Sequence, residues 1–162
     1  MLKKILCAVL LIATVITVTA CEKPKSFTYA DITLTFDKDF REEKSDDYDM
    51  LLTNGEVTAA LTRLSFVDAL NQNISAAMRE EEFAKYLLLK SGKDMEVLRR
   101  GDYAYYTYRE KTSSGELYCM ATFYRTAYAY VVVLYATSVT LETKYSEKFF
   151  EYADSAVMSL EA

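Results

Sequence analysis

The chain has 162 residues, with 19 basic and 24 acidic side chains, a net charge of −5 and no histidine. The basic residues are scattered among acids, so the clustered positive charge that binds nucleic acid is missing. The lack of histidine removes the commonest general base, the triads built on it and most zinc and copper sites. We therefore expect no nucleic-acid partner, no metal, no cofactor and no enzymatic activity.

An apolar segment follows Lys3 and Lys4 without a further charge, as in a secretion signal. It is too short to span a membrane, which takes about 20 apolar residues. The segment closes on Val-Thr-Ala-Cys at 18–21, which resembles the bacterial lipobox, where lipid is attached to the cysteine and the chain is cut before it. The resemblance implies a signal peptide at 1–20 and a mature chain held on the extracytoplasmic face of the cell membrane by lipid on Cys21.

Cleavage would leave 142 residues with 17 basic and 24 acidic groups, a net charge of −7. This length suits one domain with a sizeable core. We expect a short tether at 21–26, which reaches about 3.5 Å per residue, and a single globular domain at 27–162. Cys119 is then the one thiol left without lipid, so no disulfide can form within the mature chain. Its predicted neighbours are apolar, which favours a packed core thiol over a reactive one.

The first half of this domain carries strand and turn signals. Residues 27–36 contain an apolar–polar alternation that predicts a short hairpin. Two further strands, at 49–53 and 56–66, flank Asn54-Gly55, a strong hairpin turn signal.

The pattern then changes to helical. Ser75 is the predicted N-cap, and Phe83 and Leu87 share one face of the helix. Ser91-Gly92 is expected to end it, because glycine favours a helix C-terminus.

The second half predicts further antiparallel strands. Gly101-Asp102 and a polar turn at 112–115 separate strands at 95–100, 103–111 and 116–126. The strand at 128–137 contains a continuous apolar run, which is typical of a central strand buried on both sides. Apolar residues then recur every three or four positions and predict a final helix over 141–160.

Fourteen tyrosines make this an aromatic chain. If Lys111 pairs with Glu116, one face of the resulting hairpin holds Tyr103, Tyr105, Tyr118 and Tyr124. Two interpretations stay open. The rings are core in a covered sheet, or they form a partly open face for a partner or ligand.

The order of these elements is similar to that of the PsbP-like fold. The resemblance rests also on Phe27-Thr-Tyr29 leading into Ile32-Thr-Leu34, on Gly101 before the tyrosine-rich strand and on Ser155-x-x-x-Ser159 in the last helix. Thr35-Phe36 departs from it, since such domains usually place a proline there. The resemblance implies an α+β fold, an α/β/α sandwich with one largely antiparallel sheet and helices on both faces. Proteins with this fold include lipoproteins of the DcrB and LpqN type. The resemblance therefore implies binding or accessory work without a common catalytic site.

We therefore expect a non-enzymatic lipoprotein that binds or assists another envelope protein. The alternative is a small-ligand or glycan-binding lipoprotein that uses the tyrosine face. An enzyme is the third possibility and would have to work with carboxylates, tyrosine or lysine. A flat apolar patch would favour a protein partner, a deep pocket a ligand, and two facing acids in a cleft catalysis.

Overall fold

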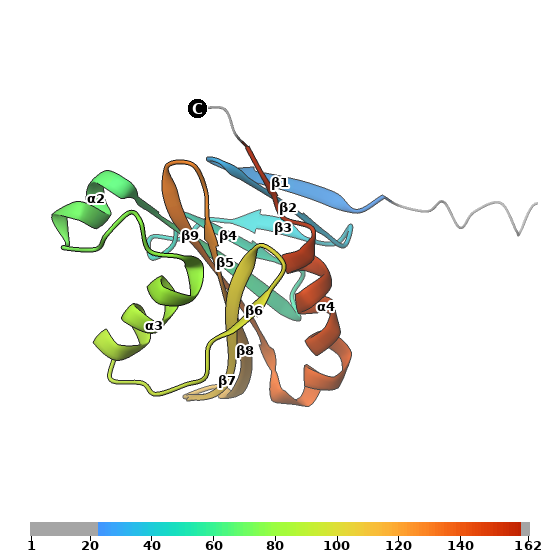
Figure 1. Ribbon diagram of the computed structural model, residues 1–162. Coiled ribbons are helices and arrows are strands. Elements are labelled where there is room, and N and C mark those ends of the chain that lie inside the picture. Colours follow the sequence, from blue (N-terminus) through green and yellow to red (C-terminus); the bar gives the residue numbers. More distant parts are fainter. Residues whose placement is uncertain (1–22, 160–162) are drawn as a thin grey trace, which may run out of the picture.

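A computed structural model of the protein describes residues 23–159, so the expected signal peptide and Cys21 lie outside the described residues. The larger of two antiparallel sheets has the strand order β3-β4-β5-β9-β8-β7-β6 (Figure 1). Its strands are β3 (Arg41–Glu43), β4 (Met50–Thr53), β5 (Val57–Ser65), β6 (Leu98–Arg100), β7 (Tyr103–Thr112), β8 (Gly115–Arg125) and β9 (Ala129–Ser138). The smaller sheet consists of β1 (Lys25–Tyr29), β2 (Ile32–Phe36) and β10 (Val157–Met158), in the order β1-β2-β10.

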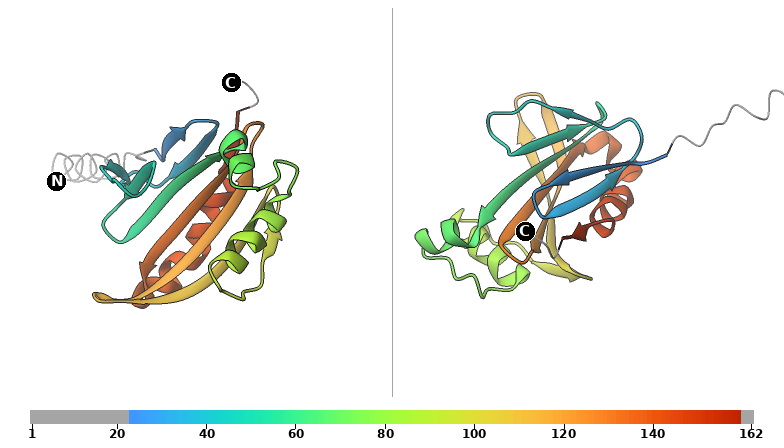
Figure 2. Two further views of the ribbon diagram at one scale, coloured as in Figure 1. Left: turned by 90° about the vertical axis from the view of Figure 1, so that its left-hand side faces the viewer. Right: turned by 90° about the horizontal axis from the view of Figure 1, so that it is seen from above.

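Helices lie on both faces of the large sheet (Figure 2). They are α2 (Phe66–Asn71), α3 (Glu80–Lys90) and α4 (Glu142–Asp154), the last preceded by a 3₁₀ turn, η1 (Val139–Leu141). α3 packs on β7 and β8, whereas α4 packs on β8, β9 and β2. The predicted α+β class and the helices on both faces are confirmed. The prediction of one sheet is wrong, because the opening hairpin forms a separate sheet with the C-terminal strand.

The predicted Lys111–Glu116 register and the predicted central place of the 128–137 strand are both confirmed. Lys111 pairs with Glu116, and β9 lies between β5 and β8 at the centre of the sheet. At the β4–β5 turn, the Asn54 side-chain oxygen accepts the backbone N–H groups of Glu56 and Val57 at 3.0 and 2.7 Å. Gly55 has φ +90°, a conformation that side chains disfavour.

Two strands begin at a different residue than predicted. β1 begins at Lys25, inside the expected tether, because Lys25 and Ser26 pair with the end of β2. The strand before Gly101 is shorter than predicted and starts only at Leu98.

α3 begins four residues later than a helix capped by Ser75 would. The Tyr130 hydroxyl donates to the carbonyl oxygens of Ser75 and Met78, at 2.8 and 2.9 Å, which holds this segment as a turn. The helix starts instead where Glu82 accepts the Arg79 backbone N–H at 2.8 Å. Its predicted end is correct, since Ser91 is the C-cap.

The final helix ends at Asp154, so the prediction that it continues to 160 is wrong. Ser155 is its C-cap, and the side chain of Ser155 accepts the Thr35 backbone N–H at 2.8 Å. The chain then leaves the helix and adds β10 to the free side of β2. A helical spacing of apolar residues could not reveal this competing strand pairing.

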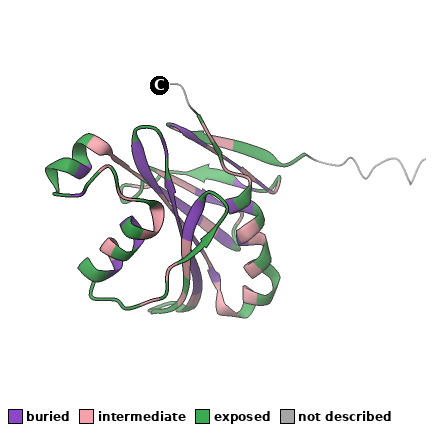
Figure 3. Ribbon diagram, in the orientation of Figure 1, coloured by how far each residue is buried: buried purple, intermediate pink, exposed green. Residues whose placement is uncertain are grey.

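Burial is concentrated in the central strands and the inner faces of the helices (Figure 3). One core cluster lies between the large sheet, α4 and β2, and the other lies between the large sheet, α3 and α2. Across residues 23–159, no helix is both long enough and apolar enough to cross a membrane.

Candidate functional site

The four predicted tyrosines are brought together on one face, but that face is closed. Tyr103, Tyr118 and Tyr124 are 3, 9 and 1% exposed, and all belong to the core cluster under α4. Tyr105 is half-buried, and its ring packs edge-on against Phe150 of α4 with centroids 5.1 Å apart. Of the two interpretations of this face, core packing is therefore the one that the structure presents.

Tyrosine hydroxyls tie α4 to its surroundings. The Tyr103 hydroxyl donates to Asp154 at 2.9 Å, and the Tyr124 hydroxyl donates to the Ala153 carbonyl at 3.0 Å. From the helix itself, the Tyr152 hydroxyl donates to Asp37 at 2.7 Å. Desolvation and the hydrogen bond to a carboxylate raise the pKa of Tyr103 and of Tyr152 far above the usual tyrosine value. Both phenols therefore stay protonated and act as donors that hold the helix.

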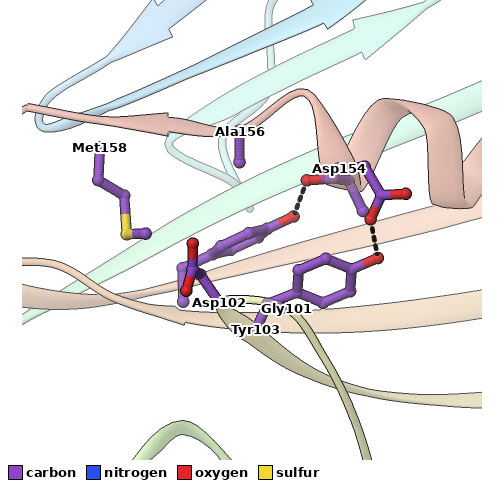
Figure 4. Close-up of a pocket in the computed structure, with 8 residues that line it drawn as sticks. Gly101, Asp102, Tyr103, Asp154, Ala156 and Met158 are labelled. Carbon is purple, nitrogen blue, oxygen red and sulfur yellow. Dashed lines mark hydrogen bonds between the residues drawn. The ribbon is translucent and has the colours of Figure 1, made fainter.

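A cavity of about 130 Å³ opens at the C-terminal end of α4 (Figure 4). Its lining includes Asp102, Tyr103, Tyr124, Asp154 and Met158. Binding pockets for small molecules usually measure about 300 to 1,000 Å³. A second hollow, of about 230 Å³, lies beside the C-terminal end of α3. Neither has the size of a typical ligand pocket.

Asp154 is engaged by its neighbours rather than left to react. The Arg100 guanidinium binds both of its carboxylate oxygens, the closer contact being 2.7 Å. Desolvation opposes ionisation of Asp154, but the hydrogen bonds from Arg100 and Tyr103 outweigh it and lower the pKa of the carboxyl group. A carboxylate with a lowered pKa and a bidentate arginine serves as a structural clamp.

Arg99 and Arg100 point to opposite faces of the sheet, as adjacent strand residues do. Arg99 binds Glu81 of α3 at 3.2 Å, whereas Arg100 binds Asp154 of α4. Cys119 is 2% exposed, and burial raises the pKa of its thiol. The described residues contain no cluster of His, Cys, Asp or Glu arranged to hold a metal ion.

Three large apolar side chains are exposed on α2 and on the neighbouring turn between β8 and β9. Val67 and Leu70 of α2 are 69 and 61% exposed, and Tyr128, in the turn between β8 and β9, is 46% exposed. We call these three residues the apical patch. α2 and this turn lie side by side, because the Phe66 backbone N–H donates to the Tyr128 carbonyl at 2.9 Å. Large apolar side chains gathered in this way mark interaction surfaces more often than isolated ones do.

α2, the helix that carries Val67 and Leu70, is fixed to the rest of the domain. Ser65 caps α2, since its hydroxyl accepts the Asp68 N–H at 3.1 Å. The Phe66 ring packs edge-on against Tyr130, with centroids 5.2 Å apart. The Arg125 guanidinium lies over the Phe66 ring and donates to the Ala76 carbonyl at 3.0 Å. The patch therefore lies on a fixed support.

A buried carboxylate braces the turn that carries Tyr128. Asp31, in the β1–β2 turn, accepts a hydrogen bond from the Thr126 hydroxyl and is contacted by the Arg63 Nε at 3.3 Å. The backbone carbonyl of Asp31 accepts the Ser159 N–H at 2.9 Å. The turn end of the small sheet is thus fixed beside the patch, and Lys25, where β1 begins, lies at the strand's other end (Figure 1).

Our sequence reasoning missed the apical patch, although a signal for α2 was present. Ser65-x-x-Asp68 is an N-cap pattern, and the segment that Ser65 opens has apolar residues at 66, 67, 69 and 70. A helix of six residues cannot bury apolar side chains on so many sides. Which of them would be exposed depends on where β5 and β9 place the helix.

The architecture is that of a PsbP-like α+β domain. Among solved structures, the chain is similar in fold to cyanobacterial PsbP (CyanoP) from Synechocystis, with 9% sequence identity, a TM-score of 0.54 and coverage of 87% of this chain and 95% of CyanoP. It is also similar to a Bacteroides thetaiotaomicron protein, with 10% identity, a TM-score of 0.57 and coverage of 83% of this chain. The chain spans only 48% of that protein. No protein-family model and no curated protein matches the sequence.

Proposed function

We propose that this chain is a lipid-anchored extracytoplasmic lipoprotein of the DcrB and LpqN kind, which binds or assists another protein of the cell envelope. The observation that carries the proposal is the apical patch, with Val67 and Leu70 more than half exposed on a helix that is fixed from below. The lipobox-like sequence ending at Cys21 supplies the membrane anchor in this proposal.

The position of the patch favours a protein partner over the lipid surface. The chain enters the domain at Lys25, whereas the patch lies beside the β1–β2 turn, at the other end of that strand. Five strand residues of about 3.3 Å each separate the two ends. An anchored domain can therefore present the patch away from the point of attachment, toward a neighbouring protein.

The geometry gives less support to a ligand-binding lipoprotein. The predicted tyrosine face is core, and the cavity beside Tyr103 and Tyr124, at about 130 Å³, is smaller than the pockets that enclose small molecules. An exposed apolar patch is instead what a protein partner buries at the centre of an interface.

The experiment crosslinks the protein in the intact cells that produce it, recovers it and identifies accompanying proteins by mass spectrometry. Cys21→Ser is the matched control and should leave the precursor uncut and without fatty-acid label. We expect one envelope protein at near-equal amount with the wild-type chain, and its loss with Cys21→Ser. Recovery of no protein above background would contradict the accessory role, and normal processing and labelling of Cys21→Ser would contradict the anchor.

A further inference from the structure

β1 is a free sheet edge of a kind that proteins usually protect. Within residues 23–159 it is the outer strand in the order β1-β2-β10 and pairs only with β2. The edge strands of the large sheet, β3 and β6, have three residues each and carry charged side chains. β1 has five residues and a single charge, Lys25 at its first position. Long edges with little charge are templates for pairing with another strand.

The hairpin geometry identifies the backbone groups that face outward. Tyr29 pairs with Ile32 across a two-residue turn, so this closing pair is hydrogen-bonded. Hydrogen-bonded and open pairs then alternate, which makes Ser26 and Thr28 the residues whose N–H and C=O groups point away from β2. Thr35, the partner of Ser26, fits this assignment, since its N–H faces away from β1 and donates to Ser155 at 2.8 Å.

The free edge of β1 is complementary to itself. An antiparallel copy centred on Phe27 places Ser26 opposite Thr28 of the second copy and Thr28 opposite its Ser26, so that both outward residues form hydrogen-bonded pairs. A register centred on Ser26 would place Thr28 opposite Pro24, which has no N–H to donate. The Phe27-centred register is therefore the one that satisfies the edge most fully.

The side chains suit the same arrangement. Phe27 is half-buried against the core under α4, and the pairing would bring the two Phe27 rings together and cover their exposed parts. The Ser26 and Thr28 hydroxyls lie on the other face, where they already bond Thr35 and Thr33 at 3.0 and 2.8 Å. Polar groups thus stay at the surface and aromatic groups are removed from water.

We propose that β1 pairs with β1 of a second copy of this chain and forms a symmetric dimer at the membrane. The interface is isologous and uses the single free β1 edge of each copy, so it closes at two copies and does not grow into a fibre. Lys25 of each copy lies opposite Tyr29 of the other in this register, so the two tethers leave about 13 Å apart along the strands if each residue rises about 3.3 Å. The pairing uses the backbone of β1 and none of the three residues of the apical patch.

Disulfide trapping tests the register in the full-length chain in its own membranes. Open antiparallel pairs have Cα atoms about 4.5 Å apart, within the range of a disulfide, so Phe27→Cys should give about tenfold more oxidised dimer than background. The wild-type chain sets that background, with Cys119 buried. Thr28→Cys is the matched control. Its neighbour across the interface is Ser26, so it should not bridge to itself.

Arg41→Cys, on the exposed edge strand β3, reports chance collision. The proposal is overturned if Phe27→Cys forms no more oxidised dimer than Arg41→Cys, or less than Thr28→Cys. Ser26→Pro gives a second test, because it removes an outward N–H without breaking the β1–β2 ladder. We expect this variant to sediment in detergent as a folded monomer and the wild type as a dimer. A dimeric Ser26→Pro or a monomeric wild type would also overturn it.

Discussion

The two faces of the large sheet are covered in different ways. On the α4 face, tyrosine hydroxyls bond Asp37, Asp154 and the Ala153 carbonyl, and no large apolar side chain of the helix is exposed. On the other face, α2 leaves Val67 and Leu70 in water. The four tyrosines predicted as a face thus lie on the closed side, whereas the surface suited to a partner consists of Val67, Leu70 and Tyr128.

The largest effect should come from the closed side. Tyr124→Ala removes a ring that is 1% exposed and a hydrogen bond to α4, so we expect a loss of about 3 to 5 kcal/mol in the free energy of unfolding. Denaturant unfolding measures this loss. Val67→Ser, on the apical patch, is the contrast and should change stability by no more than about 0.5 kcal/mol. Equal effects at the two positions would remove the distinction between the faces.

A smaller, pH-dependent effect is expected at Asp154. Asp154→Asn weakens the Arg100 pair, which is partly exposed, so the loss at neutral pH should be at most about 1 kcal/mol. The folded-state pKa of Asp154 is lowered, so its contribution is complete above the unfolded pKa of about 4 and is lost as pH falls through the folded value. The stability difference between variant and wild type should therefore shrink at acid pH. Asp102→Asn is the control, because it removes a charge from the same cavity without touching the Asp154–Arg100 pair. A stability difference between Asp154→Asn and wild type that persists at acid pH would contradict the lowered pKa of Asp154.

The smallest effect should follow from Tyr135→Phe. The Tyr135 hydroxyl is buried and makes no hydrogen bond of good geometry with a described residue. Removing an unsatisfied buried polar group is close to neutral or slightly stabilising, within about 1 kcal/mol. Tyr124→Phe, which deletes a hydroxyl that does have a partner, is the matched variant and should be the less stable of the two. The reverse order, measured by thermal unfolding, would show that Tyr135 donates to a group not identified in this account.

Local signals were enough to predict the hairpins and the central strand. Asn54-Gly55 fixed one turn, and the register of Lys111 with Glu116 placed the four tyrosines on one face, because both depend on neighbours in sequence. The apolar run in β9 indicated burial on both sides for the same reason. Whether that tyrosine face was open or closed depended on α4, which follows β9 in the chain and packs back onto the sheet.

The features that sequence reasoning missed are set by distant contacts. β10 exists because β2, more than a hundred residues earlier, offers it a free edge. Residues 75–79 stay out of α3 because Tyr130 takes the Ser75 and Met78 carbonyls. The exposure of Val67 and Leu70 likewise follows from the placement of α2 beside the β8–β9 turn. None of these contacts leaves a local periodicity that could be read beforehand.

The most direct test of the account is recovery of the envelope partner with altered surfaces. The test uses a double variant that carries both Val67→Ser and Leu70→Ser. Its control is Leu89→Ser, which changes a 78% exposed leucine on α3, away from the apical patch. We expect the double variant to fold and be lipidated normally but to recover about tenfold less of the crosslinked partner, whereas Leu89→Ser should retain it. Undiminished recovery of the partner with the double variant would contradict the claim that the apical patch is the binding surface.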